Sequence, residues 1–280
     1  MKDAAREAGE TIPGKHGGMQ MNEILYEEAE GVARITLNRP ESGNAFNQPM
    51  ADALLEVALK VGHDPDIRVV TLTGAGRMFC VGGDVGDFAK NSDKIGVFLA
   101  HLAGTLHQSL AQFSMMKKPL ITLVNGPAAG AGMSVAIGGD FVLAAPEASF
   151  TAAYCAIGLT PDGGMTWTLP RLIGLRQAQD IILSNRRVGA EEAVGLGMAT
   201  RMVSGDLAAA GAELAATLKD RAIQTMGQAR WLLNTGMTES YVAQMDRELQ
   251  SIVAAGESAE GREGVSAFLA RREPDFKGAN

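Results

Sequence analysis

The sequence is short of cysteine, carries no excess of basic residues and has no long apolar run. Its two cysteines, Cys80 and Cys155, are too few for a disulfide framework or a zinc site, and we expect Cys155 to be a buried thiol. The formal net charge of −7 argues against a general nucleic-acid binder, which needs a basic surface. No apolar run reaches the roughly 20 residues of a membrane span, so no membrane partner is expected. A phosphorylated small ligand stays compatible with this charge, because a few Lys or Arg side chains and helix N-termini can hold one.

What the sequence does contain fits a globular protein with one large domain, or with one domain and an appendage. Hydrophobic residues make up 46% and charged residues 20% of the 280 residues, which argues against wholesale disorder. Residues 1–20 are polar and glycine-rich, without the apolar core of a signal peptide. We therefore expect a cytoplasmic protein with a flexible N-terminal extension over residues 1–21.

Short apolar runs alternate with glycine loops and helical patterns through about residue 200. Two β-rich runs on either side of Gly31 predict a hairpin. Asn47 is placed to cap a helix with one buried face. Strand, glycine loop and helix in repeated succession are typical of an α/β architecture. The strands expected from these runs cover residues 24–26, 32–37, 68–73, 119–124 and 141–145.

The pattern changes after Met202, where helical periodicity continues without a strand signal. We expect a helical C-terminal region, and helical additions of this kind often make contacts between subunits. The expected helices cover roughly residues 206–219, 222–234, 239–254 and 258–271.

Two glycine-rich loops follow buried strands, and each has competing interpretations. The first, residues 74–84, lacks a dinucleotide-binding fingerprint because Phe79 stands where the third glycine belongs. A P-loop is also excluded, since no glycine in that frame is followed by Lys and then Ser or Thr. The second loop, residues 125–134, is built from small residues that would leave N–H groups exposed at a helix N-terminus, facing an anion. A tight strand-to-helix turn would explain the same residues, but two such loops together favour a pair of backbone donors.

Six short segments, in this order, carry a resemblance to a known family. Each segment alone is weak, but together they show that the sequence resembles the crotonase, or enoyl-CoA hydratase/isomerase, superfamily over about residues 22–277. Two of them, GLTPD and REGVSAFLA, are most similar to its branch of 1,2-epoxyphenylacetyl-CoA and 3-enoyl-CoA isomerases. The segments are LNRPESGNA (37–45), MFCVGGD (78–84), NGPAAGAG (125–132), GLTPDGG (158–164), LPRLIG (169–174) and REGVSAF (262–268).

The resemblance implies a ClpP/crotonase-like spiral of ββα units over residues 22–204 and a helical trimerisation region over 205–280. It further implies homotrimers or dimers of trimers and an acyl-CoA substrate, with no metal and no cofactor beyond the coenzyme A that the substrate carries. The family's two oxyanion donors map onto the backbone N–H groups of Gly83 and Ala131. Such donors stabilise a thioester oxygen as it gains negative charge. Glycine-rich loops suit this task in their own right, because a Cβ would obstruct the thioester.

The carboxylates decide which reaction the resemblance implies. The hydratase branch uses two glutamates, and Ser134 and Tyr154 stand in their positions. The paired acid–base groups of hydration are therefore missing. One carboxylate remains at Asp162, where other members place an isomerase base or a dehalogenase nucleophile.

Asp162 has to be more than a surface aspartate to act as a base. An ordinary aspartate titrates near about 3.9 and is a weak base at neutral pH. Burial against Trp167, Tyr154 and Phe150 would raise the pKa of Asp162 and strengthen it as a base. The alternative is that Asp162 is only a turn residue after Pro161.

His107 aligns with a histidine that activates water in the dehalogenase branch, which keeps a hydrolytic site open. Packing in the middle of a helix is its alternative role. Near the C-terminus, Phe268 and Lys277 would enclose the adenine end of coenzyme A, unless Phe268 packs a terminal helix and Lys277 is a solvated charge. The substrate and coenzyme A contacts that the resemblance implies are Arg39, Val81, Gly82, Asp84, Gly130, Tyr154, Phe268 and Lys277.

Three functions follow from these residues. We favour an isomerase that works through Asp162. An enoyl-CoA hydratase or a chlorobenzoyl-CoA dehalogenase-like hydrolase would need a water-activating group such as His107. A non-catalytic acyl-CoA binder would keep the glycine loops without depending on Asp162. The acyl group itself is set by pocket residues that we expect between about 85 and 115, where no motif identifies it.

Overall fold

The structure is a computed structural model that describes residues 20–278. The predicted flexible extension lies outside the described residues, apart from Gln20–Met21, which form β1 and pair with β2. From there strands alternate with helices up to β10, at Arg201–Met202. The predicted α/β class is confirmed.

A seven-stranded sheet forms the centre of the molecule, in the order β1-β2-β3-β4-β5-β7-β10. The hairpin of β2 and β3 is antiparallel, whereas the pairs from β3 to β10 are parallel. The central strands β4 and β5 are almost wholly buried on both faces, which explains their continuous apolar sequence. Every strand predicted from an apolar run is present. These strands are β2 (Ile24–Ala29), β3 (Val32–Leu37), β4 (Val69–Gly74), β5 (Leu120–Val124) and β7 (Phe141–Ala144).

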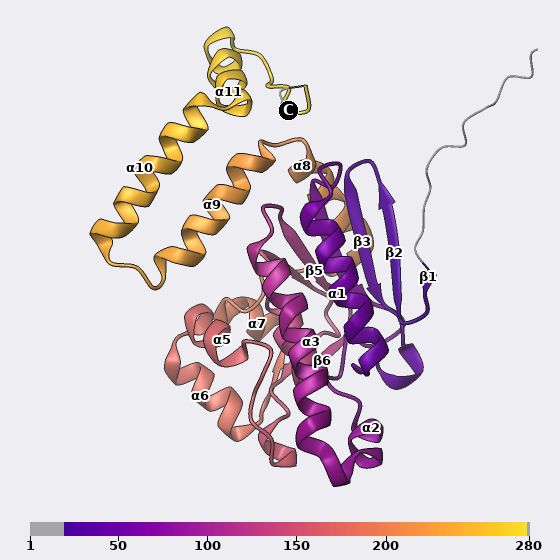
Figure 1. The fold of residues 1–280 in the computed structure, drawn as a ribbon. Helices are drawn as coiled ribbons and strands as arrows, with labels where there is room; N and C mark the ends of the chain where they lie inside the picture. The colour runs from indigo at the N-terminus through magenta and orange to yellow at the C-terminus, as the bar shows by residue number, and fades with distance from the viewer. Residues whose placement is uncertain (1–19, 279–280) are drawn as a thin grey trace, which may run out of the picture.

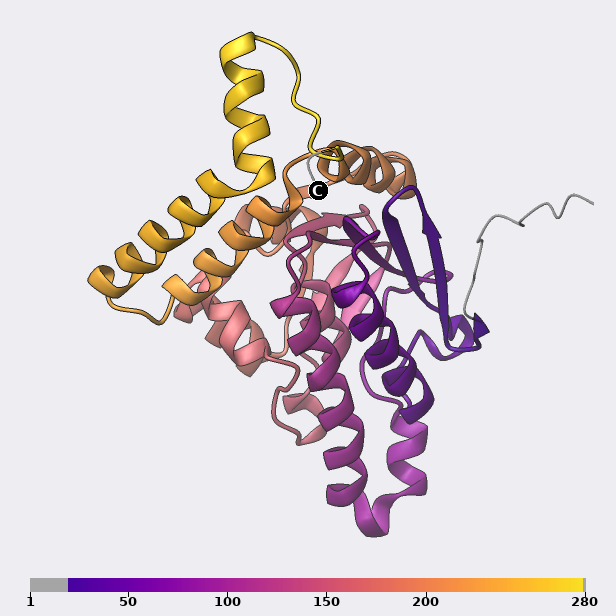
Figure 2. The same cartoon turned by 45° about the horizontal axis from the view of Figure 1, so that its top comes forward.

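Helices cover both faces of this sheet (Figures 1 and 2). On one face α1 (Gln48–His63) packs against α3 (Ile95–Met115), and both contribute to the larger core. Asn47 caps α1 as predicted, because its side chain accepts the N–H of Met50 at 3.0 Å. On the other face α8 (Leu207–Lys219) packs against β4, β5 and β7 and encloses a smaller core.

A second, three-stranded sheet of order β6-β8-β9 lies beside the glycine loops. An isolated bridge between Cys80 and Ala128 joins the first loop to β6, so the small sheet ties the two loops together. Its strands are β6 (Pro127–Ala129), β8 (Ser149–Thr151) and β9 (Arg187–Gly189). Helices α4 (Ala131–Ala136) and α7 (Ala190–Leu196) pack against it. The other helices between β4 and β10, besides α3, are α2 (Val85–Lys90), α5 (Met165–Ile173) and α6 (Leu175–Ser184).

The C-terminal region is helical, as predicted. After α8 come α9 (Ile223–Gly236), α10 (Tyr241–Glu257) and α11 (Ala259–Ala270). In Figure 1, α9 and α10 run side by side and project away from the sheet, with α11 beyond them. No residue of α10 is buried, so this helix touches the rest of the described chain only lightly. The predicted boundary at 204/205 falls between β10 and α8, and the division into these parts stays a prediction.

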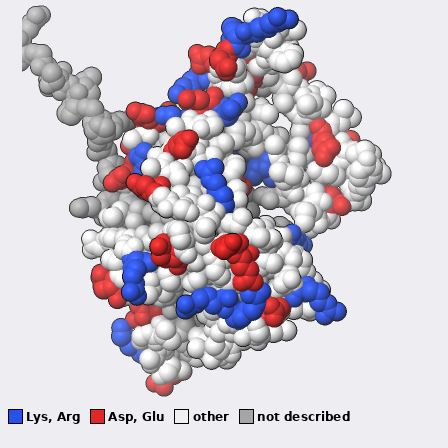
Figure 3. Space-filling view, turned by 180° about the vertical axis from the view of Figure 1, so that it is seen from behind, with Lys and Arg blue, Asp and Glu red and all other residues white. Residues whose placement is uncertain are grey.

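Basic and acidic side chains are interspersed on the face of the molecule shown in Figure 3. A short row of basic side chains on this face lies directly beside acidic ones. Among the helices of residues 20–278, none combines the length and the apolar character that a membrane crossing requires.

Candidate active site

The two glycine loops pack backbone against backbone. The first follows β4 and the second follows β5, so both lie at the carboxyl ends of neighbouring parallel strands. A Cβ at Gly126 would lie 2.0 Å from the carbonyl oxygen of Arg77, and one at Gly132 would lie 2.1 Å from that of Cys80. The Ala129 N–H donates to the same Cys80 carbonyl at 2.9 Å. Glycine is therefore required at these points by close approach.

This packing brings the two predicted oxyanion donors to one place. Gly82 and Gly130 both adopt positive φ, at 99° and 53°, which turns the chain just before each donor. A Cβ on Gly82 would lie 3.5 Å from the Ala131 nitrogen, which shows how close the loops are. Within residues 20–278, neither the Gly83 N–H nor the Ala131 N–H donates to a protein acceptor. The arrangement is suited to binding one oxygen that carries negative charge.

Both donors line a cavity of about 380 Å³. Its walls are mostly apolar, and the ionisable side chains among them are Tyr154 and Asp162. Helices α2 and α3 supply much of the wall, in a stretch without a recognisable sequence motif. The lining residues are Phe46, Val81, Gly82, Gly83, Val85, Phe88, Leu99, Leu102, Ala103, Leu106, Gly130, Ala131, Ala153, Tyr154, Ile157, Leu159, Thr160 and Asp162.

Asp162 is held by its neighbours at both its side chain and its backbone. The Tyr154 hydroxyl donates to Asp162 Oδ1 at 2.5 Å. The Ser134 hydroxyl donates to the backbone carbonyl of Asp162 at 2.9 Å. The two residues that stand at the hydratase glutamate positions therefore both bind Asp162.

The Tyr154 hydroxyl keeps its proton and donates it to the hydrogen bond with Asp162. Burial raises the pKa of its hydroxyl well above the usual range, and the charge of the adjacent Asp162 carboxylate raises the pKa further. The hydroxyl therefore keeps its proton across the physiological range.

His107 lies against the turn that carries Asp162. Its Nε2 accepts the backbone N–H of Gly163 at 3.0 Å, so the proton of the neutral ring is on Nδ1. The same Nε2 is 3.5 Å from Asp162 Oδ2, but without a proton on Nε2 this contact is neither a hydrogen bond nor an ion pair. His107 does not line the acyl cavity. It opens onto a second cavity of about 650 Å³ behind the 162–163 turn, together with Ser134 and Gly163.

Arg39 and Asp84 pair with each other at the rim of the first loop. The Arg39 guanidinium donates to Asp84 Oδ2 at 2.9 Å and to the Ala45 carbonyl at 2.5 Å. The Asp84 carboxylate also caps α2 by accepting the N–H groups of Gly86 and Asp87. Burial alone would raise the pKa of Asp84, but Arg39 and the two backbone donors hold it below the usual value. Neither charged side chain lines the cavity, and both brace the loop.

Phe268 and Lys277 lie on the C-terminal region and do not reach this cavity within the described chain. Phe268 is 82% exposed on α11, and Lys277 pairs with Asp220 at 2.6 Å. Their contact with coenzyme A stays a prediction.

Two expectations about side chains near Asp162 are wrong. Phe150 is fully buried in the core and Trp167 is 45% exposed on α5, where its ring lies 4.0 Å from the Arg171 guanidinium. Of the three aromatic residues expected around Asp162, only Tyr154 lines the cavity, because α5 turns the face with Trp167 outward. Cys155 is exposed in a short 3-10 helix and is not a buried thiol. Cys80 is buried, and burial raises its pKa to about 12.

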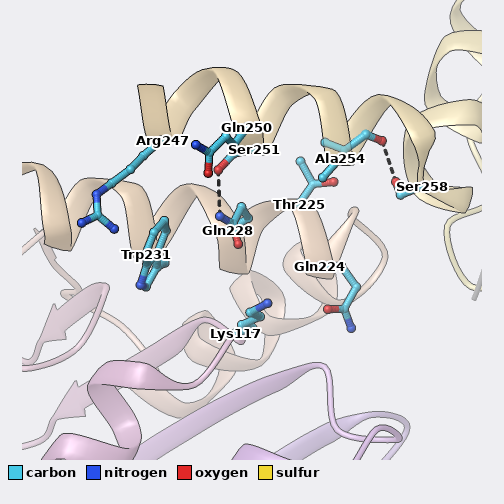
Figure 4. A pocket seen from close by; sticks show the side chains of 11 residues that line it. Lys117, Gln224, Thr225, Gln228, Trp231, Arg247, Gln250, Ser251, Ala254 and Ser258 are labelled. Carbon is cyan, nitrogen blue, oxygen red and sulfur yellow. Dashed lines mark hydrogen bonds between the residues drawn. The ribbon is translucent and has the colours of Figure 1, made fainter. Parts of the chain in front are cut away.

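A separate polar groove of about 350 Å³ lies between α9 and α10 (Figure 4). The Gln228 amide donates to the Ser251 hydroxyl at 2.8 Å across this groove. The Arg247 guanidinium lies 5.5 Å from the ring of Trp231. None of the predicted site residues lines the groove, so its polar contacts hold two helices together apart from the candidate site.

Known proteins are similar to this chain over the residues that carry the resemblance. A family model described as enoyl-CoA hydratase/isomerase matches residues 27–279, which include all six segments of the resemblance. The chain is 40% identical over 265 residues to the 1,2-epoxyphenylacetyl-CoA isomerase of Escherichia coli (strain K12), covering 92% of this chain and 99% of that protein. It is 27% identical over 234 residues to 4-chlorobenzoyl coenzyme A dehalogenase-2 of Arthrobacter sp., covering 83% of this chain and 85% of that protein. The crystal structure of an enoyl-CoA hydratase from Polaromonas sp. JS666 aligns with a TM-score of 0.86 at 31% identity, covering 90% of this chain and 98% of that one.

Proposed function

The chain belongs to the enoyl-CoA hydratase/isomerase family, and from this premise we propose that it is an acyl-CoA isomerase whose base is Asp162. The observation that carries the proposal is that, among residues 20–278, Asp162 is the only carboxylate lining the cavity that Gly83 and Ala131 share. A shift of a carbon–carbon double bond needs one base that takes a proton and gives it back. Hydration by paired carboxylates needs a second one, which this cavity lacks.

The proposed reaction moves the double bond of a 3-enoyl-CoA into conjugation with the thioester. Asp162 removes a proton from the carbon next to the thioester carbonyl, and the electron pair moves onto the carbonyl oxygen. The N–H groups of Gly83 and Ala131 stabilise that oxygen while the dienolate exists. Asp162 then returns the proton two carbons along, which restores the carboxylate. Each backbone donor of such a pair contributes roughly 10²–10³ in rate.

The lining of the cavity supports acyl groups that are apolar and uncharged. Leu99, Leu102, Leu106 and Phe88 face the acyl chain, and no Lys, Arg or His side chain lines this cavity within the described residues. A second carboxylate at the far end of an acyl chain would enter without a partner and near the charge of Asp162. We therefore propose that dicarboxylic acyl-CoA thioesters are poor substrates.

The hydrolytic alternative depends on His107, and the geometry argues against it. A histidine that activates water needs a free nitrogen lone pair directed at the water. Here the lone pair of Nε2 is occupied by the Gly163 N–H, and the ring lines the cavity behind Asp162. We therefore place isomerisation ahead of dehalogenase-like hydrolysis.

The assembly belongs to the proposal as well. The helices α9, α10 and α11 expose apolar side chains, among them Leu249, Ile252 and Leu269. Exposed apolar surface of this kind marks an interaction site. We propose that these helices join copies of the chain in a trimer or a dimer of trimers. A cytoplasmic location and a requirement for no cofactor beyond coenzyme A stay predictions.

Conversion of a 3-enoyl-CoA to its conjugated 2-enoyl-CoA, followed by absorbance, tests the function. Wild type should convert the substrate with little addition of water. The variant Asp162→Asn should lose about 10²–10⁴ in kcat, the contribution of a positioned general base. The control is Asp66→Asn, which changes an exposed aspartate outside the cavity and should retain full activity. Full activity in Asp162→Asn would remove the proposed base, and binding of acyl-CoA without turnover by wild type would favour a binding protein.

A further inference from the structure

The two oxygens of the Asp162 carboxylate have different neighbours. Oδ1 accepts the Tyr154 hydroxyl at 2.5 Å. Oδ2 lies 3.5 Å from His107 Nε2, which accepts the Gly163 N–H and so presents no proton to Asp162. Within residues 20–278, Oδ2 has no hydrogen-bond donor. The carboxylate is therefore held at one oxygen and open at the other.

Tyr154 is a durable donor for Oδ1. Tyr154 is 9% exposed. Its hydroxyl stays protonated because burial and the nearby Asp162 carboxylate both oppose its ionisation. A buried hydroxyl without an acceptor costs free energy. Breaking the bond to Oδ1 would therefore be unfavourable for Tyr154 as well as for Asp162. The bond is also short, as is typical of a hydroxyl that donates to a charged oxygen.

The backbone below the carboxylate is fixed too. The Ser134 hydroxyl binds the Asp162 carbonyl at 2.9 Å. Gly163 follows with a φ of 60°, and a Cβ there would lie 2.9 Å from the Cβ of Ser134. The titratable groups that contact the carboxyl group are Tyr154 and His107, and no Lys or Arg of the described residues pairs with it. Only rotation about the Cβ–Cγ bond could exchange the two oxygens, and the Tyr154 bond opposes that rotation.

We propose that Tyr154 is the positioning residue of Asp162, because its hydroxyl keeps Oδ1 as a permanent acceptor and leaves Oδ2 as the single oxygen that carries the substrate proton. The inference rests on the proposed isomerase function. In the first step the substrate C–H bond breaks, an O–H bond forms at Oδ2, and the electron pair passes to the thioester oxygen. In the second step the same O–H bond breaks as the proton returns to carbon. Tyr154 keeps its own proton throughout.

A tyrosine that only filled space would be replaced without loss by phenylalanine, which keeps the ring. The test is therefore Tyr154→Phe, assayed for isomerisation of a 3-enoyl-CoA as a function of pH. On the alkaline plateau kcat should fall about tenfold to a hundredfold, the loss expected when a base is misplaced. KM should stay within about twofold, because phenylalanine keeps the ring that Tyr154 contributes to the cavity wall.

The matched control is Tyr26→Phe. Tyr26 is also buried, at 3% exposure, and its hydroxyl donates to Glu28 at 3.1 Å on β2. This variant should retain both the kcat and the KM of wild type. Thermal melting of both variants separates loss of folding from loss of positioning.

A direct readout of the carboxyl group keeps the inference testable without turnover. Carbon-13 NMR of aspartate-labelled protein, with the Asp162 signal assigned by Asp162→Asn, compares this carboxyl signal in wild type and in Tyr154→Phe at one pH. The Asp162 carboxyl signal should shift in the variant, because Oδ1 loses the hydroxyl that donates to it. An unmoved signal overturns the role of Tyr154, whatever happens to kcat. An inactive wild type would overturn the proposed isomerase alone, since the carboxyl signal still decides whether Tyr154 holds this carboxylate.

Discussion

Gly132 lies where the second glycine loop passes closest to the first. A Cβ at this position would lie 2.1 Å from the carbonyl oxygen of Cys80 and 2.7 Å from its carbonyl carbon. Both atoms belong to the backbone and cannot swing aside as a flexible side chain would. Ala131, one of the two proposed oxyanion donors, is the preceding residue. A substitution here therefore acts on stability and on the donor at once.

We expect Gly132→Ala to lower the free energy of unfolding by about 1–3 kcal/mol, the cost of forcing extra volume into a packed region. It should also lower kcat by about tenfold or more, because the Ala131 N–H moves away from the thioester oxygen. Denaturant unfolding and the isomerase assay measure the two effects. Gly104→Ala is the control, because Gly104 lies inside α3 with no atom within 4 Å of its added Cβ. That variant should be more stable by about 0.5–1 kcal/mol, and a similar gain in Gly132→Ala would contradict the argument.

Several of the predicted site residues lie together, but the bonds between them could not be predicted from the sequence. Gly83, Ala131, Tyr154 and Asp162 line one cavity, and their roles in it stay predictions. The hydrogen bond from Tyr154 to Asp162 could not be predicted, because it depends on side-chain rotamers and on a turn eight residues away in sequence. Trp167 was misplaced for a related reason. Its exposure depends on how α5 packs against the rest of the protein, and a local sequence pattern does not predict that packing.

At the scale of elements, α2 depends on a cap that also ends the first glycine loop. Asp84 accepts the N–H groups of Gly86 and Asp87 at the start of α2, and its other oxygen binds Arg39. The side chains of Arg39 and Asp84 are only 19% and 20% exposed, so solvent screens the pair less than a surface ion pair. Helix α2, the first glycine loop and the neighbouring Gly83 donor therefore all depend on Asp84.

The pH dependence of this cap has a defined sign. The pKa of Asp84 is held below its usual value in the folded protein, so folding favours the charged form. Its contribution is fully present above about pH 4 and is lost as the pH falls through the lower folded pKa. We expect Asp84→Asn to lower the free energy of unfolding by about 1 kcal/mol at pH 7, because Asn can still cap α2 but loses the charge that pairs with Arg39.

Denaturant unfolding of wild type and Asp84→Asn between about pH 2.5 and pH 7 measures this contribution. The difference between the two proteins should shrink at the acid end, where Asp84 is protonated in both states. Asp93→Asn serves as the control, because it replaces an exposed aspartate and should leave stability nearly unchanged. A difference that stays constant down to the lowest pH would show that the charge of Asp84 is not what stabilises α2.

Elements with a strong local signal were predicted, and those held by distant pairing were not. The strands β4 and β5 have continuous apolar sequences because both faces are buried, and α1 has both a cap and a periodic face. The strands β6, β8 and β9 have three residues each and exist through pairing with distant partners. Such short pieces carry no period that a sequence pattern can show.

At the scale of the whole molecule, the C-terminal helices expose many large apolar side chains, as interaction surfaces do. No residue of α10 is buried, yet the helix carries Leu249 at 60% and Ile252 at 70% exposure. Beyond it, α11 exposes Phe268 at 82% and Leu269 at 76%. These side chains lie on helices that project from the sheet, where a second copy of the chain can reach them (Figure 1). Burial of this surface between copies would explain its composition.

We expect wild type to be a trimer or a multiple of three, and Leu249→Glu with Ile252→Glu to dissociate it. Burying two unpartnered carboxylates in an apolar interface costs several kcal/mol, enough to shift an assembly equilibrium by orders of magnitude. Sedimentation and light scattering give the mass of both proteins at matched concentrations. Leu59→Glu on α1, which is 42% exposed, is the control and should keep the mass of wild type. Helix α10 forms no part of the cavity walls, so a monomeric variant that still isomerises substrate would place the interface outside the chemistry. A wild type that is already monomeric would mean that the apolar face of α10 serves another partner and that the trimer is not a property of this chain.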